Sequence, residues 1–147
     1  MSKTGKYDDS ICASSDFEEL SRIRDFVKKS ALTYGFEEHQ AQQIALAVDE
    51  ACSNLIRHAF NFDKKREICI EIETDKNSFI VKVLDDGAPF NPLEVNPPDM
   101  KEYFRKYQRG GLGISIMRKV MDKILYQASN KKNPKNILKL IKNMNGN

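Results

Sequence analysis

Three side chains that could act on a metal-bound phosphate are spaced four residues apart: Glu50, Asn54 and His58. In a helix, this spacing places them along one side. A carboxylate can accept a proton or hold a water molecule, and an amide oxygen can ligate a hard cation such as Mg²⁺. A solvated polar face on an amphipathic helix would show the same pattern. The row by itself leaves both interpretations open.

A second candidate is an acid and a glycine, Asp85 and Gly87, which follow an apolar run. A carboxylate at the end of a buried strand can accept a hydrogen bond from an exocyclic amine, and a glycine lets a flat ring approach the backbone. An ordinary Asp-Gly turn is the favoured explanation when this motif is taken alone.

A third candidate is the glycine box Gly110-Gly111-Leu112-Gly113, which precedes a predicted amphipathic helix over residues 114–122. Glycines at a helix N-terminus expose backbone N–H groups that can hold phosphate oxygens, assisted by the helix dipole. A flexible joint or an N-cap explains the box equally well.

Residues 91–109 lie between the second and third motifs and contain three prolines but no strand pattern. A stretch of this length inside a compact domain is usually a lid or a binding loop. Residues 100–107 could form a short helix within it. We therefore predict a lid at 91–109.

Two helices must position the first motif. The helix that carries it is predicted to begin near Glu37 and to end in a polar turn at 61–65. Its apolar residues gather on one broad arc at 3.6 residues per turn: Ile44, Val48, Ala51, Cys52, Leu55, Ile56 and Ala59. The preceding helix begins at the capping residue Asp16, with Glu19 at the capping-box position, and ends at 34–36. Its apolar residues at helical spacing are Phe17, Leu20, Ile23, Phe26, Val27 and Leu32.

Alternating apolar and polar residues predict two paired strands at 67–74 and 79–84, joined by a hairpin turn. Ile68, Ile70 and Ile72 are expected to face the core. Further strands are predicted at 10–15, which suits an edge, and at 123–128 and 136–141. This order of elements predicts an α+β fold, a two-layer sandwich with helices on one face of a mainly antiparallel mixed sheet.

The 147 residues suit one domain, which we place at 10–147 after a flexible N-terminus at 1–9. A net charge of +3 with interspersed acids and bases does not favour nucleic acid as a partner. No apolar run is long enough for a membrane span or a signal peptide. Cys12, Cys52 and Cys69 sit among apolar neighbours and are expected to be buried free thiols in a reducing compartment. We therefore expect a cytoplasmic protein without a membrane partner.

The three motifs in this order, E-x-x-x-N, D-x-G and G-x-G, resemble those of the GHKL ATPase superfamily, whose fold is the Bergerat ATP-binding sandwich. Within it, the chain is most similar to the RsbW-type anti-sigma-factor serine/threonine kinases. The segments that carry the resemblance are DEACSNLIRHAF, VLDDGAPFNP and GGLGISIMRKVMD. The resemblance extends from about Ser10 to Ile141.

The resemblance implies a role for each matching position. Asn54 would ligate Mg²⁺, and Glu50 would be the general base that activates the attacking hydroxyl. Asp85 would accept the adenine amino group, with Gly87 packed beside the ring. The other nucleotide-binding positions would be Arg57, His58, Pro89, Arg109, Gly110, Gly111, Leu112, Gly113 and Asn136. Among these, Gly111 and Gly113 would present backbone N–H groups to the phosphates.

Some positions depart from the family's pattern. Pro89 stands where a second glycine is frequent, and Asn136 stands where a threonine often precedes the last strand and helps to hold adenine. In the lid, Arg105, Lys106 and Arg109 could each neutralise the γ-phosphate, and the sequence does not choose among them. These departures leave ATP binding in place and bear on catalysis and partner choice.

The resemblance implies an ATP- and Mg²⁺-binding anti-sigma-type regulator. Its expected chemistry is transfer of the ATP γ-phosphate to a serine or threonine of a small anti-anti-sigma (STAS-type) protein. The expected partners are that protein, a sigma factor and a second copy in a homodimer. The alternative is an ATP-dependent module that sequesters a partner without kinase activity. A nucleic-acid binder that acts through the lysine-rich C-terminus is the weakest of the three interpretations.

Overall fold

The computed structural model describes residues 7–94 and 113–144. Five strands form one sheet: β1 (Tyr7–Ser14), β2 (Glu67–Thr74), β3 (Ser78–Asp85), β4 (Lys123–Gln127) and β5 (Asn136–Asn143). Three α-helices are described: α1 (Leu20–Tyr34), α2 (Glu38–Asn54) and α4 (Gly113–Val120). Short 3₁₀ turns occupy Phe17–Glu19 and Pro92–Glu94.

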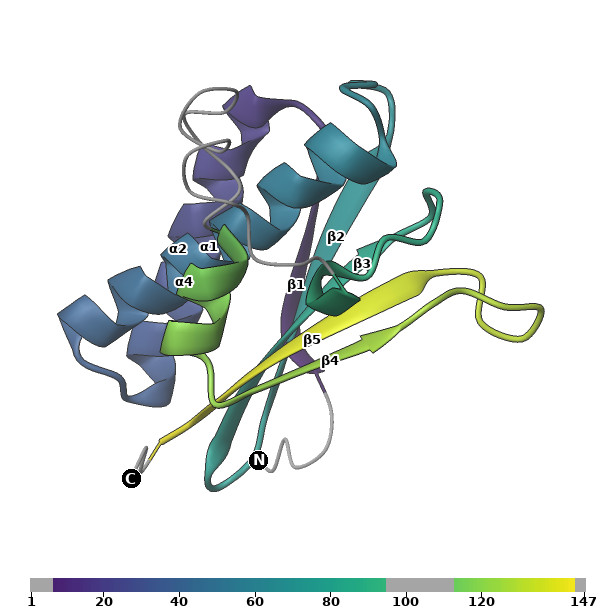
Figure 1. The fold of residues 1–147 in the computed structure, drawn as a ribbon. Helices are drawn as coiled ribbons and strands as arrows, with labels where there is room; N and C mark the ends of the chain where they lie inside the picture. The colour runs from purple at the N-terminus through teal and green to yellow at the C-terminus, as the bar shows by residue number, and fades with distance from the viewer. Residues whose placement is uncertain (1–6, 95–112, 145–147) are drawn as a thin grey trace.

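The strand order is β1-β2-β3-β5-β4, and each of these four pairings is antiparallel. Figure 1 shows α1, α2 and α4 gathered on one face of this sheet. The predicted α+β two-layer sandwich is therefore confirmed. β1 lies at an edge as predicted, and it begins at Tyr7, inside the stretch expected to be flexible.

The core lies between the helices and the sheet. Ile68, Ile70 and Ile72 are buried as the alternation predicted, because successive side chains of a strand point to opposite faces. Six of the seven residues on the predicted α2 arc are buried, and Ala59 is partly buried. Met117 of α4 and Met121, which directly follows this helix, are buried, and α4 packs against α2.

Both ends of α1 differ from the simple amphipathic pattern. The Asp16 carboxylate accepts a hydrogen bond from Glu18 N at 3.0 Å and caps the 3₁₀ turn that leads into α1. Gly35 ends the helix with φ 128°, a backbone conformation that suits glycine. Phe17 and Leu32, which fit the apolar spacing, are each 41% exposed because they lie at the two ends of the helical segment.

The predicted helix around the first motif is not α-helical to its end. After Asn54, residues Leu55–Ala59 form a π-helical turn, in which Phe60 N donates to Leu55 O at 2.8 Å. Asn61 and Phe62 follow with positive φ values of 54° and 66°. The five-residue hydrogen-bond spacing takes in an extra residue, so His58 does not continue the straight row through Glu50 and Asn54.

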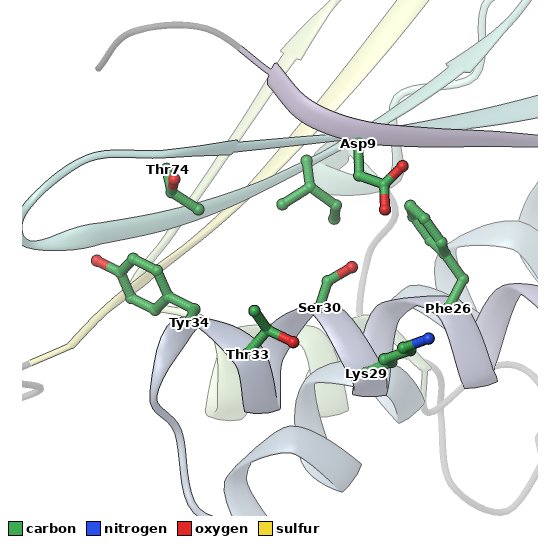
Figure 2. A pocket seen from close by; sticks show the side chains of 8 residues that line it. Asp9, Phe26, Lys29, Ser30, Thr33, Tyr34 and Thr74 are labelled. Atoms are coloured by element: carbon green, nitrogen blue, oxygen red, sulfur yellow. The ribbon is translucent and has the colours of Figure 1, made fainter. Parts of the chain in front are cut away.

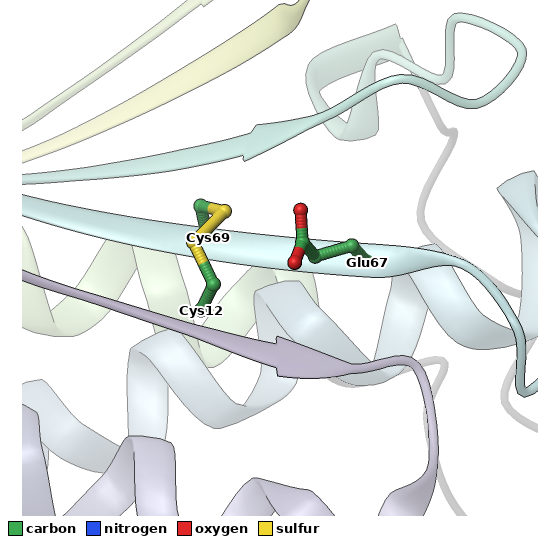
Figure 3. Close-up of side chains that lie close together, drawn as sticks. All are labelled: Cys12, Glu67 and Cys69. Atoms are coloured by element: carbon green, nitrogen blue, oxygen red, sulfur yellow. A yellow bond between two sulfur atoms is a disulfide. The ribbon is translucent and has the colours of Figure 1, made fainter.

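The prediction of three buried free thiols is correct only for Cys52. Cys12 and Cys69 are directly opposite in the β1–β2 register and form a disulfide (Figure 3), with their Cα atoms 4.1 Å apart. Apolar neighbours misled the prediction, because a residue between two inward-facing isoleucines must itself face outward. The cysteines therefore give no support for a reducing compartment.

Candidate functional site

The end of β3 forms a closed polar turn. Asp85 is 3% exposed, and its Oδ1 atom accepts hydrogen bonds from Gly87 N at 2.8 Å and from Asn136 Nδ2 at 3.0 Å. Asn136, at the start of β5, is the register partner of Asp85, and its Nδ2 also donates to Gly87 O at 2.9 Å. Three predicted site residues are thus brought into direct contact.

The burial of Asp85 disfavours the charged form of its carboxylate. Burial raises the pKa of this carboxyl, and the hydrogen bonds from Asn136 and Gly87 oppose that rise. Both of these hydrogen bonds go to Oδ1 and not to its second oxygen, Oδ2. Asp85 therefore retains an acceptor for a ligand's N–H group.

Gly87 is required by its protein neighbours. A Cβ atom at this position would lie 2.6 Å from Cε1 of Phe60 and 3.3 Å from Asp85 Oδ1. The Phe60 ring is covered in turn by the Arg66 guanidinium, 5.2 Å from the ring centroid. Arg66 also donates to the Asp86 backbone oxygen at 2.9 Å and to its carboxylate at 3.0 Å. Phe60 and Arg66 brace the D-x-G turn, a role that the sequence did not indicate.

Asn54 supplies the second polar group of the site. Its side chain is 4% exposed, and Nδ2 has no hydrogen-bond partner among the described residues. A buried polar group left without a partner costs about 1–3 kcal/mol. Rotation of the carboxamide can present either its oxygen or its nitrogen to a ligand. The unpaired amide therefore fits a bound ligand or a metal ion.

Asn54 and Asp85 line the same cavity. Its other walls come from α2, the sheet and the segment after β3: Ala51, Leu55, Val83, Phe90, Pro92, Tyr126 and Leu138. The cavity volume is about 10 Å³, room for about one water molecule. Phe90 N donates to the Tyr126 hydroxyl at 3.1 Å, and Arg118 of α4 donates to Leu93 O at 3.2 Å. These contacts hold the segment after β3 over the cavity, so this segment must move before a flat ring can enter.

The remaining predicted residues near Asn54 differ in their surroundings. Glu50 is partly buried on α2, one turn before Asn54. Arg57 lies in the π-helical turn with its guanidinium 5.4 Å from the Phe17 ring centroid, and its NH1 atom is buried without a described partner. The exposed His58 stacks on Phe90, with ring centroids 5.1 Å apart. Desolvation, and then the charge of Arg57, lower the pKa of His58, which favours the neutral form of this imidazole.

The third motif is largely outside the described residues. Gly113 begins α4, while Arg109, Gly110, Gly111 and Leu112 fall within 95–112, together with Arg105 and Lys106. Most of the predicted lid falls there too. Pro89 is exposed in the turn after Gly87. Tyr126 was missed, although its inward position in the alternating strand Lys123–Gln127 could have indicated it.

A larger cavity, of about 520 Å³, lies between α1 and strands β1 and β2. Figure 2 shows Phe26, Lys29, Ser30, Thr33 and Tyr34 of α1 facing Asp9 and Thr74 across it. None of the three sequence motifs contributes to its lining. The smaller cavity is the better candidate site because it alone joins the buried Asp85 carboxylate to the unpaired Asn54 amide.

The model of one known family covers most of this chain. The histidine kinase-like ATPase domain matches residues 13–142, which include Asn54, Asp85 and Asn136. The chain belongs to this family. The match confirms the family resemblance noted from the three motifs. It covers β2, β3 and β4 in full, β5 except its last residue, and the last two residues of β1.

Individual members of the histidine kinase-like ATPase family are also similar to the chain. Serine-protein kinase RsbW of Bacillus subtilis is 27% identical over 114 residues, 75% of this chain and 71% of that protein. The protein of the same name from Bacillus velezensis is 26% identical over 116 residues, 76% and 72% of the two chains. The protein of the same name from Listeria monocytogenes is 30% identical over 94 residues, 61% of this chain and 60% of the relative.

Of the helices in the described parts of the chain, none has the length and apolar character needed to cross a membrane.

Proposed function

We propose that the chain is an ATP-dependent serine/threonine kinase that acts as an anti-sigma-type regulator. The observation that carries this proposal is the pairing, in one cavity, of the buried Asp85 carboxylate with the unpaired Asn54 amide. Family membership supports ATP as the nucleotide. The name serine-protein kinase, borne by the relatives from Bacillus and Listeria, supports a protein hydroxyl as the acceptor.

In this proposal, Asp85 Oδ2 accepts a hydrogen bond from the adenine amino group, while Asn136 and Gly87 hold Oδ1 in place. The Asn54 amide oxygen is the protein ligand for Mg²⁺. A bound Mg²⁺ supplies charge neutralisation for the transferring phosphoryl group. Gly110–Gly113 supply backbone N–H groups to the phosphates, and one of Arg105, Lys106 and Arg109 neutralises the γ-phosphate. Residues 91–109 form the lid, and the single domain includes β1 from Tyr7 onward.

Glu50 is the proposed general base. It lies one helical turn before Asn54, so its carboxylate can reach past the metal ligand toward an incoming hydroxyl. The acceptor oxygen attacks the γ-phosphorus, the bond between that phosphorus and the β–γ bridging oxygen breaks, and ADP leaves. Glu50 takes the hydroxyl proton. Arg57 and Pro89 line the nucleotide region, and the neutral His58 contributes a ring surface, since it carries no charge for phosphate.

The proposed acceptor is a STAS-type anti-anti-sigma protein, and the proposed second partner is a sigma factor, both in the cytoplasm. A homodimer is also proposed. On the sheet face away from the helices, Ile80, Leu84, Ile137 and Ile141 are only half-buried, and Leu125 beside them is 42% exposed. Such an apolar face suits contact with a second copy. Light scattering at several protein concentrations measures this directly.

Incubation of the purified chain with Mg²⁺–ATP and STAS-type proteins tests the proposal. We expect ATP to be converted to ADP with one phosphate appearing on a serine or threonine of the acceptor. The sequestering alternative predicts stable, nucleotide-dependent binding of a partner without phosphate on any acceptor. Absence of ATP binding would contradict both.

A further inference from the structure

Two aromatic rings lie exposed beside the candidate site. Phe62 is 58% exposed and Phe17 is 41% exposed, and their ring centroids are 6.2 Å apart. The Arg57 guanidinium lies over the Phe17 ring. We call these three residues the aromatic patch. A single exposed apolar residue needs no explanation, but two large rings exposed together under a guanidinium resemble the centre of an interface, where Phe and Arg are enriched.

The backbone that carries Phe62 is unfavourable for this residue. Its φ of 66° places a bulky side chain in the left-handed region, next to Asn61 at 54°. Asn adopts this region readily, whereas a bulky residue there is an outlier. A glycine at position 62 would remove the conflict, yet the chain holds an exposed phenylalanine. Packing does not explain this choice, because more than half of the side chain is in solvent.

The loop around Phe62 is nevertheless firmly held. Phe62 N donates to Ile56 O at 2.7 Å, at the end of the π-helical turn. Ser15 ties the following residues to the start of α1: its hydroxyl donates to Asp63 O, and its N–H donates to Arg66 O at 2.9 Å. The two rings are therefore presented from a fixed frame, which lowers the entropy lost when a partner binds.

Arg57 connects the aromatic patch to the candidate site along the chain. Arg57 belongs to the patch and lies three residues after Asn54 on the same helical segment. A partner that covered Phe17 and Phe62 would therefore reach the end of α2 at which Asn54 lines the cavity. The three residues of the patch are far fewer than the roughly 20–30 residues that each partner contributes to a stable interface. A transient contact with a substrate protein suits it better.

We propose that the aromatic patch is the docking surface for the STAS-type protein that accepts the phosphate. The inference rests on the proposed kinase function. An apolar side chain of the acceptor packs on the Phe17 and Phe62 rings, and its serine or threonine hydroxyl is thereby directed toward Glu50 and Asn54. The strained Phe62 is retained because it contributes to this contact.

The test is the affinity of a purified STAS-type protein for the chain, measured by fluorescence with Mg²⁺ and a non-hydrolysable ATP analogue. Phe17→Ala and Phe62→Gly are each expected to raise the Kd for the acceptor about tenfold or more, as for central interface residues. The Kd for the ATP analogue is expected to stay within twofold. Leu32→Ala, which truncates an apolar side chain as exposed as Phe17 near the C-terminal end of α1, is the matched control and should bind as wild type does.

The stability of Phe62→Gly separates a docking role from a structural one. Glycine adopts a φ of 66° without steric cost, so the Tm of this variant should equal or exceed that of wild type. An acceptor Kd unchanged in both aromatic variants would overturn the docking proposal, and a lowered Tm with an unchanged Kd would assign Phe62 a structural role instead.

Binding is measured without phosphoryl transfer, so the two proposals can fail separately. A wild-type chain that binds the acceptor but transfers no phosphate contradicts the kinase function, and the variants still decide the role of the patch. A wild-type chain that transfers phosphate without loss in either variant overturns the patch alone. A chain that binds no STAS-type protein overturns docking, whatever its behaviour with ATP.

Discussion

The buried charge of Asp85, which we propose binds adenine, lowers the stability of the folded chain. Burial raises the pKa of this carboxyl above its value in the unfolded chain, so the folded state holds its proton more tightly. Stability therefore falls as the pH rises from the unfolded pKa through the folded pKa. The buried charge is retained at this cost, as expected of a group kept for a ligand.

Asp85→Asn tests this conflict. The asparagine oxygen can keep the hydrogen bonds from Gly87 and Asn136, while the buried charge is removed. We expect the free energy of unfolding at pH 7 to be unchanged or higher. ATP affinity should fall about 5- to 150-fold, because an amide N–H would face the adenine amino group and such a mispaired group costs about 1–3 kcal/mol. Calorimetry with ATP and thermal unfolding measure the two effects. Wild-type ATP affinity in this variant would show that Asp85 does not contact adenine.

Glu50 and Asn54 should separate chemistry from binding. Glu50→Gln keeps the shape of the side chain and removes its basicity, so ATP binding should stay within a few-fold while transfer to the acceptor falls about 10²–10⁴-fold. Asn54→Ala removes the proposed metal ligand and should weaken Mg²⁺–ATP binding itself. Parallel calorimetry and single-turnover assays measure both. If Glu50→Gln transferred phosphate at the wild-type rate, Glu50 could not be the base.

At the scale of elements, the D-x-G turn depends on side chains from two other segments. Phe60 follows the π-helical turn, Arg66 immediately precedes β2, and together they cover the backbone of Gly87 and Asp86. The turn therefore has little freedom on its Phe60 side. Its other side faces the segment 90–94, which must move when a nucleotide enters.

Arg66→Met should loosen this brace. The variant loses a partly exposed ion pair with Asp86 and a cation–π contact with Phe60, together about 1 kcal/mol. We expect a small fall in stability and a several-fold weaker affinity for ATP. Arg22→Met, which breaks the exposed pair with Glu19 on the α1 side, is the control and should leave ATP affinity unchanged. Equal ATP affinities for the two variants would argue against the brace.

Much of the architecture could be predicted because periodicity reports burial. The bounds of β2 agree with the prediction, as does the buried arc of α2. The π-helical turn could not be predicted, because the residues LIRHA are compatible with an α-helix and the extra residue is set by tertiary contacts. The pairing of Cys12 with Cys69 also escaped prediction, since it depends on the register between β1 and β2.

The candidate site was only partly predictable for a similar reason. Asn54, Asp85, Gly87 and Asn136 are indicated by motifs, and the structure brings them together from three separate elements. Tyr126, Phe60 and Arg66 carry no motif and act through contacts that only the folded chain creates. The roles of the indicated residues remain predictions.

For the whole molecule, the Cys12–Cys69 disulfide joins the edge strand to the rest of the sheet across 57 residues. In the chain-entropy model, closing such a loop contributes about 4 kcal/mol. Treatment with a reducing agent should therefore lower the Tm of the wild-type chain. It should not alter the Tm of a Cys12→Ser variant, which serves as the control.

The remaining cysteine, Cys52, is buried, and this burial raises the pKa of its thiol. The oxidised folded protein should therefore show no reactive thiol in a colorimetric assay.

The link between Asp85 and Asn136 predicts which residues can replace either of them. Asn136 uses one N–H of its amide for the carboxylate and the other for Gly87 O, whereas a threonine hydroxyl has a single proton to donate. If a threonine replaced Asn136, the carbonyl oxygen of Gly87 would lose its hydrogen-bond donor. A water molecule would then have to supply that hydrogen bond, or the turn would have to change its conformation. Substitutions at positions 85–87 and 136 should therefore be inherited as a set, and a chimaera that mixes the two solutions should lose nucleotide affinity even though each half comes from a working protein.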